Sequence, residues 1–278
     1  MSPIFGRGTR IRGSLSSAPT SGLTAGDEYY NSAENQKYIY NSASESWRKI
    51  SGNILTSNGD PFDDSSSIVA FRMNGNATSL SGTSYTGTLG GNNSSSNFVA
   101  GGQFGQYFNA TGTTHLHDNS ASIAPTGAYS LSFWYKSNTT GQDNKRVLTV
   151  KGATISSGWN NYNNSVGFYI GNGIATNSSS VATVTRVAEI PDAEINDNIW
   201  HQLAYTVAAT NSWTIYLDGA AYSGAVSGEG RSFNSSSRLA ITTYDGGDVY
   251  NSICGIDQVR LFSRVLTSAE IGDLYNEN

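Results

Sequence analysis

The sequence is poor in cysteine, in charge and in long apolar runs. Its 278 residues include one cysteine, Cys254, so no disulfide can form within the chain. Cys254 follows Ile253 in an apolar stretch, where a buried and unreactive thiol is expected. Charged residues make up 13% of the chain, and the 16 lysines and arginines are not interleaved with aromatic residues on one face. This pattern argues against a nucleic-acid-binding groove.

No apolar run approaches the roughly 18 residues that a membrane-spanning helix needs, so membrane insertion is not expected. The first residues, MSPIFGRGTRIRG, are basic but are not followed by an apolar stretch, unlike a signal peptide. We therefore expect a protein that stays in the cytoplasm or leaves it by a route other than the general secretory pathway, for example on a particle released by lysis. For the same reason the Asn-x-Ser/Thr triplets are not interpreted as glycosylation sites.

The residues that are abundant are those of strands and turns. Aromatic residues make up 11% of the chain, which also has 31 glycines. In SLSFWYKS, Leu131 and Phe133 alternate with Ser132 and Trp134, the period of a strand. Asp218-Gly219, between apolar flanks, is a strong hairpin signal. These patterns predict an all-β protein built as a two-sheet antiparallel sandwich.

The end of the chain, FSRVLTSAEIGDLY, has a helical pattern instead. Thr267 and Glu270 have the spacing of a capping box, and Leu266 and Ile271 have that of a hydrophobic staple. Ile271 also shares one face with Leu274 and Tyr275. We therefore expect one short C-terminal helix.

The first 51 residues differ from the rest. Residues 1–25 are rich in Gly, Ser, Pro and Thr, and we expect them to be extended and ordered only on a partner. Residues 26–50 repeat a Tyr-Asn-Ser-Ala motif and predict three short strands near 28–31, 37–41 and 46–50. Because about 25 residues cannot form a core of their own, we interpret 1–51 as a docking segment. Its candidate contact residues are Arg7, Arg10, Arg12, Tyr29, Tyr30, Tyr38, Tyr40 and Trp47.

Residues 52–278 resemble a laminin-G-like domain of the concanavalin A-like lectin/glucanase superfamily. The resemblance lies in five blocks in order: SSIVAFRMNGNATSLSG, GGQFGQYFNATG, SLSFWYKS, IWHQLAYTVAATNSWTIYLDGA and GIDQVRLFSRVLTSAEIGDLYN. It implies a jelly roll whose last strand, around 256–262, is followed by a helix. The apolar face of that helix, with Ile271 and Leu274, is expected to plug the edge of the sandwich.

The segment G-D-x-Y-Y-N … Y-x-Y-N … W resembles short β-segments near the start of bacteriophage virion proteins, especially tail and fibre components. This resemblance implies a virion location, with other virion proteins as partners. The low charge and the small tyrosine-rich attachment also favour a homo-oligomer.

Catalytic residues are not predicted. Jelly-roll glucanases carry a closely spaced Glu-x-Asp-x-x-Glu run on one strand, which this chain lacks. Glu189, Asp192 and Glu194 are interrupted by Pro191 and are interpreted as loop residues. His115 and His117 share one side of a strand but have no nearby third zinc ligand. His201 is expected to be structural.

Calcium is the ion that the resemblance implies, because many laminin-G-like domains bind one at a sandwich edge with carboxylate and carbonyl oxygens. The candidate ligands are Asp245, Asp248 and Asp257. Ser79 stands where the family commonly has Asp, which removes one ligand. Ordinary turn chemistry is the alternative explanation of the Asp-Gly at 245–246.

For glycan recognition, the sequence offers aromatic residues that we predict to lie in exposed loops and neighbouring amides. The candidates are Trp159, Asn160, Asn161, Tyr162, Asn163 and Tyr244. Loop aromatics can equally anchor protein neighbours.

Together these features predict a non-enzymatic bacteriophage virion protein with an outward-facing lectin-like domain. It would be a tail or fibre adhesin or a capsid decoration protein that binds its virion neighbours and a host-surface polysaccharide. A bacterial carbohydrate-binding or adhesion module and a divergent glycosidase are the alternatives.

Overall fold

The computed structural model describes residues 11–15, 18–20, 28–31, 36–41, 46–49, 60–62, 64–80, 85, 87–118, 127–142, 145–151, 156–162, 165–171, 184–208, 212–227, 238–243 and 250–277. The chain divides into two compact units, Met1–Leu55 and Thr56–Asn278. This boundary lies four residues beyond the one that the sequence indicated, after residue 51.

The N-terminal unit contains a sheet of four described strands in the order β1-β2-β3-β4. Its strands are β1 (Ile11–Leu15), β2 (Glu28–Asn31), β3 (Gln36–Asn41) and β4 (Ser46–Lys49). The three predicted strands are present as an antiparallel meander. β1, in the segment expected to be extended, pairs in parallel with β2 of the same chain. Whether residues 1–25 need a partner to become ordered stays a prediction.

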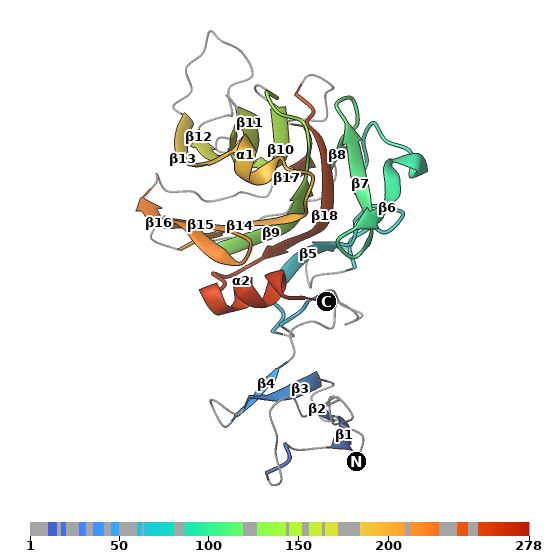
Figure 1. The fold of residues 1–278 in the computed structure, drawn as a ribbon, viewed down its shortest axis with the longest axis vertical. Helices are drawn as coiled ribbons and strands as arrows, with labels where there is room; N and C mark the ends of the chain where they lie inside the picture. The colour runs from blue at the N-terminus through green and yellow to red at the C-terminus, as the bar shows by residue number, and fades with distance from the viewer. Residues whose placement is uncertain are drawn as a thin grey trace, which may run out of the picture. The chain divides into compact units, whose positions relative to one another are not determined.

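The C-terminal unit is a sandwich of two antiparallel sheets (Figure 1). Over the described residues, one sheet has six strands in the order β13-β12-β11-β10-β17-β8. These strands are β13 (Val184–Pro191), β12 (Ser165–Gly171), β11 (Ser156–Tyr162), β10 (Lys145–Lys151), β17 (Arg238–Ile241) and β8 (Leu116–His117). The predicted all-β, two-sheet jelly-roll architecture is thus confirmed.

The second sheet has eight described strands, seven of them in the order β16-β15-β14-β9-β18-β7-β6, with β5 pairing β18. They are β16 (Ala220–Ser227), β15 (Ser212–Leu217), β14 (His201–Val207), β9 (Tyr129–Lys136), β18 (Ile253–Phe262), β7 (Gly105–Thr111), β6 (Phe98–Gly102) and β5 (Ser67–Phe71). A short 3-10 helix, η1 (Ser95–Asn97), precedes β6.

The core lies between the two sheets and follows the alternation of the strands. Leu131, Phe133 and Tyr135 of β9 are fully buried and belong to one cluster with Leu148 of β10 and Trp159 of β11. Each such side chain stabilises the fold by about 1.5–3 kcal/mol relative to an exposed one. Because alternate residues of β9 point away from this core, Ser132 and Trp134 lie on the outer face of the eight-stranded sheet.

The turn between β15 and β16 is the predicted hairpin. Asp218 and Gly219 both have positive φ, 50° and 77°, as a type I′ turn requires. A Cβ added to Gly219 would lie 2.9 Å from the Cβ of Tyr275, so the glycine also permits a close approach of the chain's end. Local sequence and tertiary packing therefore select the same residue.

Helix α2 (Ser268–Tyr275) has the predicted capping box. Thr267 Oγ1 accepts a hydrogen bond from Glu270 N at 3.2 Å, and the Glu270 carboxylate accepts one from Thr267 N at 2.8 Å. The expected place of the helix is wrong, however. Ile271 and Leu274 pack on Ala204, Tyr216 and Phe262, which belong to the eight-stranded sheet. The helix therefore covers the outer face of this sheet and not the edge of the sandwich.

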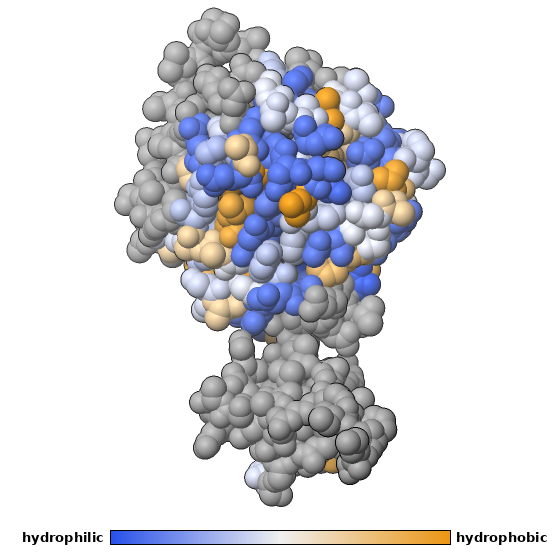
Figure 2. Space-filling model, in the orientation of Figure 1, coloured by the Kyte–Doolittle hydropathy of each residue, from blue (hydrophilic) through white to orange (hydrophobic). Residues whose placement is uncertain are grey.

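No helix of the described residues is long and apolar enough to cross a membrane. Figure 2 shows one face of the structure, where the described hydrophobic residues form small separate spots among hydrophilic ones. This face therefore offers polar groups to a partner more than a continuous apolar patch.

Candidate functional site

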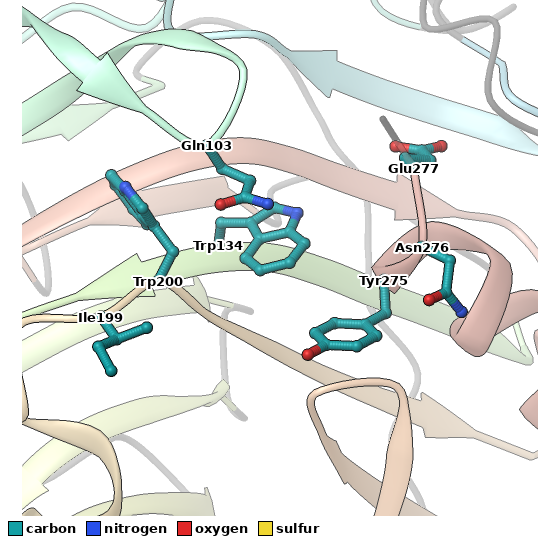
Figure 3. Close-up of a pocket in the computed structure, with 7 residues that line it drawn as sticks. All are labelled: Gln103, Trp134, Ile199, Trp200, Tyr275, Asn276 and Glu277. Atoms are coloured by element: carbon teal, nitrogen blue, oxygen red, sulfur yellow. The ribbon is translucent and has the colours of Figure 1, made fainter.

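An open pocket of about 400 Å³ lies on the outer face of the eight-stranded sheet, beside the end of α2. Its lining is aromatic and polar: Gln103, Trp134, Ile199, Trp200, Tyr275, Asn276 and Glu277. Figure 3 shows these side chains, which come from the β6–β7 turn, β9, the segment before β14, the end of α2 and the two residues after it.

Trp134 of β9 lines the pocket and is largely buried. It lies across from Gln202 of β14 and from Asp257 of β18, in the middle of the sheet. Its ring stacks with that of Tyr275, with centroids 5.6 Å apart and an angle of 20° between the planes. Phe104 contacts the indole edge to face at 6.1 Å. Trp134 is therefore fixed by contacts from two other segments, and 4% of it remains exposed.

Trp200 forms the opposite wall and is partly exposed. Its indole N–H donates to the carbonyl of Gly101 at 3.0 Å, and its ring meets Tyr107 edge to face at 5.1 Å. A Cβ on Gly255 would lie 2.8 Å from the Tyr107 ring and 3.0 Å from that of Trp200, so both rings cover a glycine of β18. Lys136 Nζ lies 5.8 Å from the centroid of the Trp200 ring.

The rim carries amides that are available to a ligand. The Gln103 side chain makes no hydrogen bond with the described residues. Asn276 Nδ2 donates to Gly272 O at 2.7 Å, which leaves its Oδ1 as an acceptor. Ile199, 60% exposed, adds an apolar contact.

Asp257 holds the turn that presents Gln103. One carboxylate oxygen accepts from Phe104 N at 3.1 Å, and the other accepts from Gln258 N at 2.8 Å. Burial raises the pKa of this carboxyl to about 6, although these backbone donors and Arg260 oppose the shift. The side chain is completely buried and acts as a structural link between β18 and the β6–β7 turn.

Glu277 is the one carboxylic acid among the lining residues, and it is buried. Its Oε2 lies 2.6 Å from Nη1 of Arg260, which is also buried. Burial raises the pKa of the Glu277 carboxyl, and Arg260 opposes this shift. The ion pair attaches the end of the chain to β18.

The lining suits binding better than catalysis. Glycoside hydrolysis requires two carboxyl groups across the substrate, and the pocket supplies one, which is paired. In the part of the chain that the structure describes, no group of three or more His, Cys, Asp or Glu side chains could hold a metal ion.

A family model described as "Concanavalin A-like lectin/glucanases superfamily" (Laminin_G_3) matches residues 108–272. The chain belongs to this superfamily. The expected laminin-G-like resemblance is thus confirmed, and residues 108–272 include three of the lining residues, Trp134, Ile199 and Trp200. The search of curated proteins found no match.

Solved structures share the lectin-like fold at low sequence identity. The botulinum neurotoxin serotype D binding domain is 15% identical with a TM-score of 0.56; the alignment covers 76% of this chain and 51% of that one. Domain 4 of AbnA, a GH43 extracellular arabinanase from Geobacillus stearothermophilus solved with arabinotriose, is 13% identical with a TM-score of 0.55. The alignment covers 76% of this chain and 98% of that domain. This chain thus spans about half the length of the neurotoxin domains that it matches.

The described residues of the predicted glycan loop lie in a strand. Trp159 lies in strand β11 and is completely buried in the core, so its prediction as an exposed loop residue is wrong. Asn160, Asn161 and Tyr162 belong to the same strand, not to a loop. Asn163 and Tyr244 lie outside the described residues.

The predicted calcium ligands are not tested as a set, because Asp245 and Asp248 also lie outside the described residues. Asp257 is described, and both of its carboxylate oxygens accept hydrogen bonds from the backbone. Ser79 Oγ, at the position where the superfamily commonly has Asp, accepts from Ala70 N at 3.2 Å.

The three acids considered for hydrolysis have separate structural contacts. Asp192 accepts from Gly141 N at 3.1 Å and from Asn196 Nδ2 at 2.8 Å, whereas Glu194 accepts from the Tyr222 hydroxyl at 3.3 Å. The loop prediction for this stretch is wrong. Glu189 lies in β13, which ends at Pro191, and Asp192 starts the short helix α1 (Asp192–Ile195).

The histidines and the cysteine have structural surroundings. The rings of His115 and His117 lie 5.2 Å apart, and His115 Nε2 accepts from Asn92 N at 3.3 Å. Cys254 is buried, and burial raises the pKa of its thiol. His201 lies between two carboxylates and is treated below.

The predicted docking residues are only partly described. Arg12, Tyr29, Tyr30, Tyr38, Tyr40 and Trp47 belong to the strands of the N-terminal unit. Arg7 and Arg10 lie outside the described residues. The docking role therefore stays a prediction.

Sequence reasoning missed the pocket. The available signal was Trp134, a large aromatic residue on the otherwise polar face of SLSFWYKS. The contribution of Tyr275 and Trp200 could not be seen, because the three residues meet only after the strands have paired.

Proposed function

We propose that the protein is a non-enzymatic bacteriophage virion protein whose lectin-like unit binds a glycan in the outer-face pocket. It would serve as a tail or fibre adhesin or as a capsid decoration protein. The observation that carries the binding role is the stacked pair of Trp134 and Tyr275 beside the Gln103 amide and the Asn276 amide oxygen.

The chemistry of the pocket suits a sugar. Aromatic rings offer apolar surface to the C–H groups of a pyranose or furanose, and convergent polar groups fix its orientation. Tyr275 and Trp200 are partly exposed, so a sugar can contact both. Gln103 and Asn276 supply a donor and acceptors for its hydroxyl groups.

The virion role draws on the division of the chain into two units. The tyrosine-rich sheet of the first unit, with β1–β4, is a candidate for contacts with neighbouring virion proteins or with further copies of this chain. The sandwich unit then faces outward and meets a host-surface polysaccharide.

A bacterial carbohydrate-binding or adhesion module is the second candidate. The fold shared with domain 4 of the arabinanase favours it, because that domain was solved with arabinotriose and is matched over 98% of its length. A divergent glycosidase would require a second carboxylate facing the sugar, which the lining does not supply.

We retain calcium as a proposal for the sequence segment that contains Asp245 and Asp248. Hard carboxylate oxygens suit this ion. Asp257 is the weakest of the three candidates, because its oxygens already accept from backbone N–H groups.

Two experiments test the proposal. Mass spectrometry of purified virions should detect the protein as a stoichiometric component, and its absence would refute the virion role. An array of bacterial polysaccharides and oligosaccharides, arabinotriose included, should show selective binding by the whole chain. A protein that binds no glycan but is present in virions would have a purely structural role, whereas sugar turnover would show an enzyme.

A further inference from the structure

His201 lies between two carboxylates at the start of β14. Its Nδ1 is 2.8 Å from Oδ2 of Asp218, and its Nε2 is 3.2 Å from Oδ1 of Asp197. The residue is 9% exposed, so water contributes little to solvating the ring. Neither contact belongs to the pocket itself.

Asp197 and Asp218 lie in two segments that contribute to, or contact, opposite walls of the pocket. Asp197 lies in the segment that carries Ile199 and Trp200, and its Oδ1 also accepts from Ile199 N at 2.8 Å. Asp218 lies in the β15–β16 turn, where Gly219 approaches Tyr275 closely. His201 therefore links the segment that carries Trp200 to the β15–β16 turn that contacts Tyr275.

We propose that His201 is a positioning residue for the pocket and holds the Ile199–Trp200 wall in place only in its protonated form. The inference rests on the proposed glycan site, and it adds that binding depends on pH.

The dependence on protonation follows from the number of N–H donors on the His201 ring. An ionised carboxylate only accepts hydrogen bonds, and a neutral imidazole has one N–H and one lone pair. The ring can donate to both carboxylates at once only as the imidazolium, which has an N–H on each nitrogen. The hydrogen bond with Asp218 accordingly raises the pKa of His201, with Asp197 adding to the shift and burial opposing it.

The other groups around the ring do not change this balance. Tyr135 lies directly across from His201 on β9, is uncharged, and donates its hydroxyl to Asn196 Oδ1 at 2.7 Å. The acidic groups that act on the ring are Asp197 and Asp218. Lys136, the residue after Tyr135, has its ammonium group over the Trp200 ring.

Loss of the proton affects the two contacts unequally. The Asp218 contact is the shorter, and Asp218 also accepts from Gln202 N at 2.8 Å, so the neutral ring keeps its proton on Nδ1. The lone pair of Nε2 then faces Asp197 Oδ1 and repels it. Because the same oxygen holds Ile199 N, the segment that carries Ile199 and Trp200 is released.

The first test needs no ligand. Nuclear magnetic resonance follows the His201 imidazole and the Trp200 indole N–H of the whole chain from pH 5 to 9. The two should titrate with one midpoint in the native protein. In Asp197→Asn, His201 should still titrate, but the Trp200 signal should no longer follow it, because a neutral amide oxygen is repelled less by the Nε2 lone pair and keeps its contact with Ile199 N. A Trp200 signal that ignores His201 in the native protein overturns the proposal.

The second test measures arabinotriose binding at pH 6 and pH 8.5. We expect affinity at least about threefold weaker at pH 8.5. Asp197→Asn should flatten this ratio, and Glu194→Gln, whose carboxylate instead contacts Tyr222, should keep it. Equal affinity at both pH values overturns the positioning role and leaves the glycan site intact. If arabinotriose does not bind at all, the glycan proposal fails for this sugar and the Trp200 titration decides alone.

Discussion

Trp134 and Tyr275 stack with ring centroids 5.6 Å apart, although one lies in a central strand and the other ends the last helix. The contact exists because α2 packs on the outer face of the eight-stranded sheet through Ile271 and Leu274. The terminal helix thus both covers apolar side chains of the sheet and completes a pocket. Binding variants on this helix therefore need a parallel measurement of stability.

Truncation of the exposed pocket aromatics should abolish most of the binding. Trp200→Ala and Tyr275→Ala should each weaken the affinity for an array-positive glycan by about 2 kcal/mol, roughly thirtyfold, as expected for a central aromatic contact. Isothermal titration calorimetry measures the change. Tyr222→Ala is the matched control, because Tyr222 is 36% exposed and does not line the pocket. Equal losses in all three variants would contradict the proposed site.

The buried ion pair at the chain's end should matter for stability. Glu277→Ala leaves Arg260 buried without its carboxylate, so the free energy of unfolding should fall by about 3–5 kcal/mol. Urea denaturation measures this value. Glu194→Ala, an exposed acid on α1, should change it by less than about 1 kcal/mol. A small effect for Glu277→Ala would show that the end of the chain is not anchored by this pair.

Asp257 should make the protein less stable as the pH rises. Its pKa of about 6 in the folded protein lies above the ordinary value near 4. The stabilisation is therefore complete below about pH 4 and is lost as the pH rises through about 6, by roughly 2 to 3 kcal/mol.

Urea denaturation at pH 4, 5, 6 and 7 tests this dependence by comparison with Asp257→Asn, which does not titrate. The difference in unfolding free energy between the two proteins should change across this range in favour of the variant. His201 has a raised pKa as well, but its contribution is lost only above the ordinary histidine value of about 6.5, so the two windows differ. A constant difference between the proteins would show that Asp257 is not the titrating group.

Calcium addition should raise the melting temperature if Asp245 and Asp248 bind the ion. Calorimetry with calcium, magnesium or a chelator measures the shift. We expect Asp245→Asn and Asp248→Asn to remove a calcium-specific shift. The same melting temperature in calcium and chelator would refute the calcium proposal.

The sequence predicted those features that depend on neighbouring residues. The capping box of Thr267 and Glu270 and the turn at Asp218-Gly219 follow from local chemistry, and both are present. The alternation in β9 correctly separated Leu131 and Phe133 from Ser132 and Trp134.

The features that depend on distant parts of the chain were not predictable in this way. Trp159 was expected to lie in an exposed loop with neighbouring amides, yet its strand places it in the core. Trp134 was on the face expected to be polar, but that face is covered by Tyr275 and Phe104 from other segments. Pairing of distant strands decides which aromatic residue is accessible.

A crystal structure of the whole protein with the oligosaccharide that binds best on the array tests the central claim most directly. The account predicts the sugar in the outer-face pocket, in contact with Trp200 and Tyr275 and hydrogen-bonded to Gln103 or Asn276. A sugar bound elsewhere, for example beside Asn160 to Asn163, with an empty outer-face pocket would contradict it.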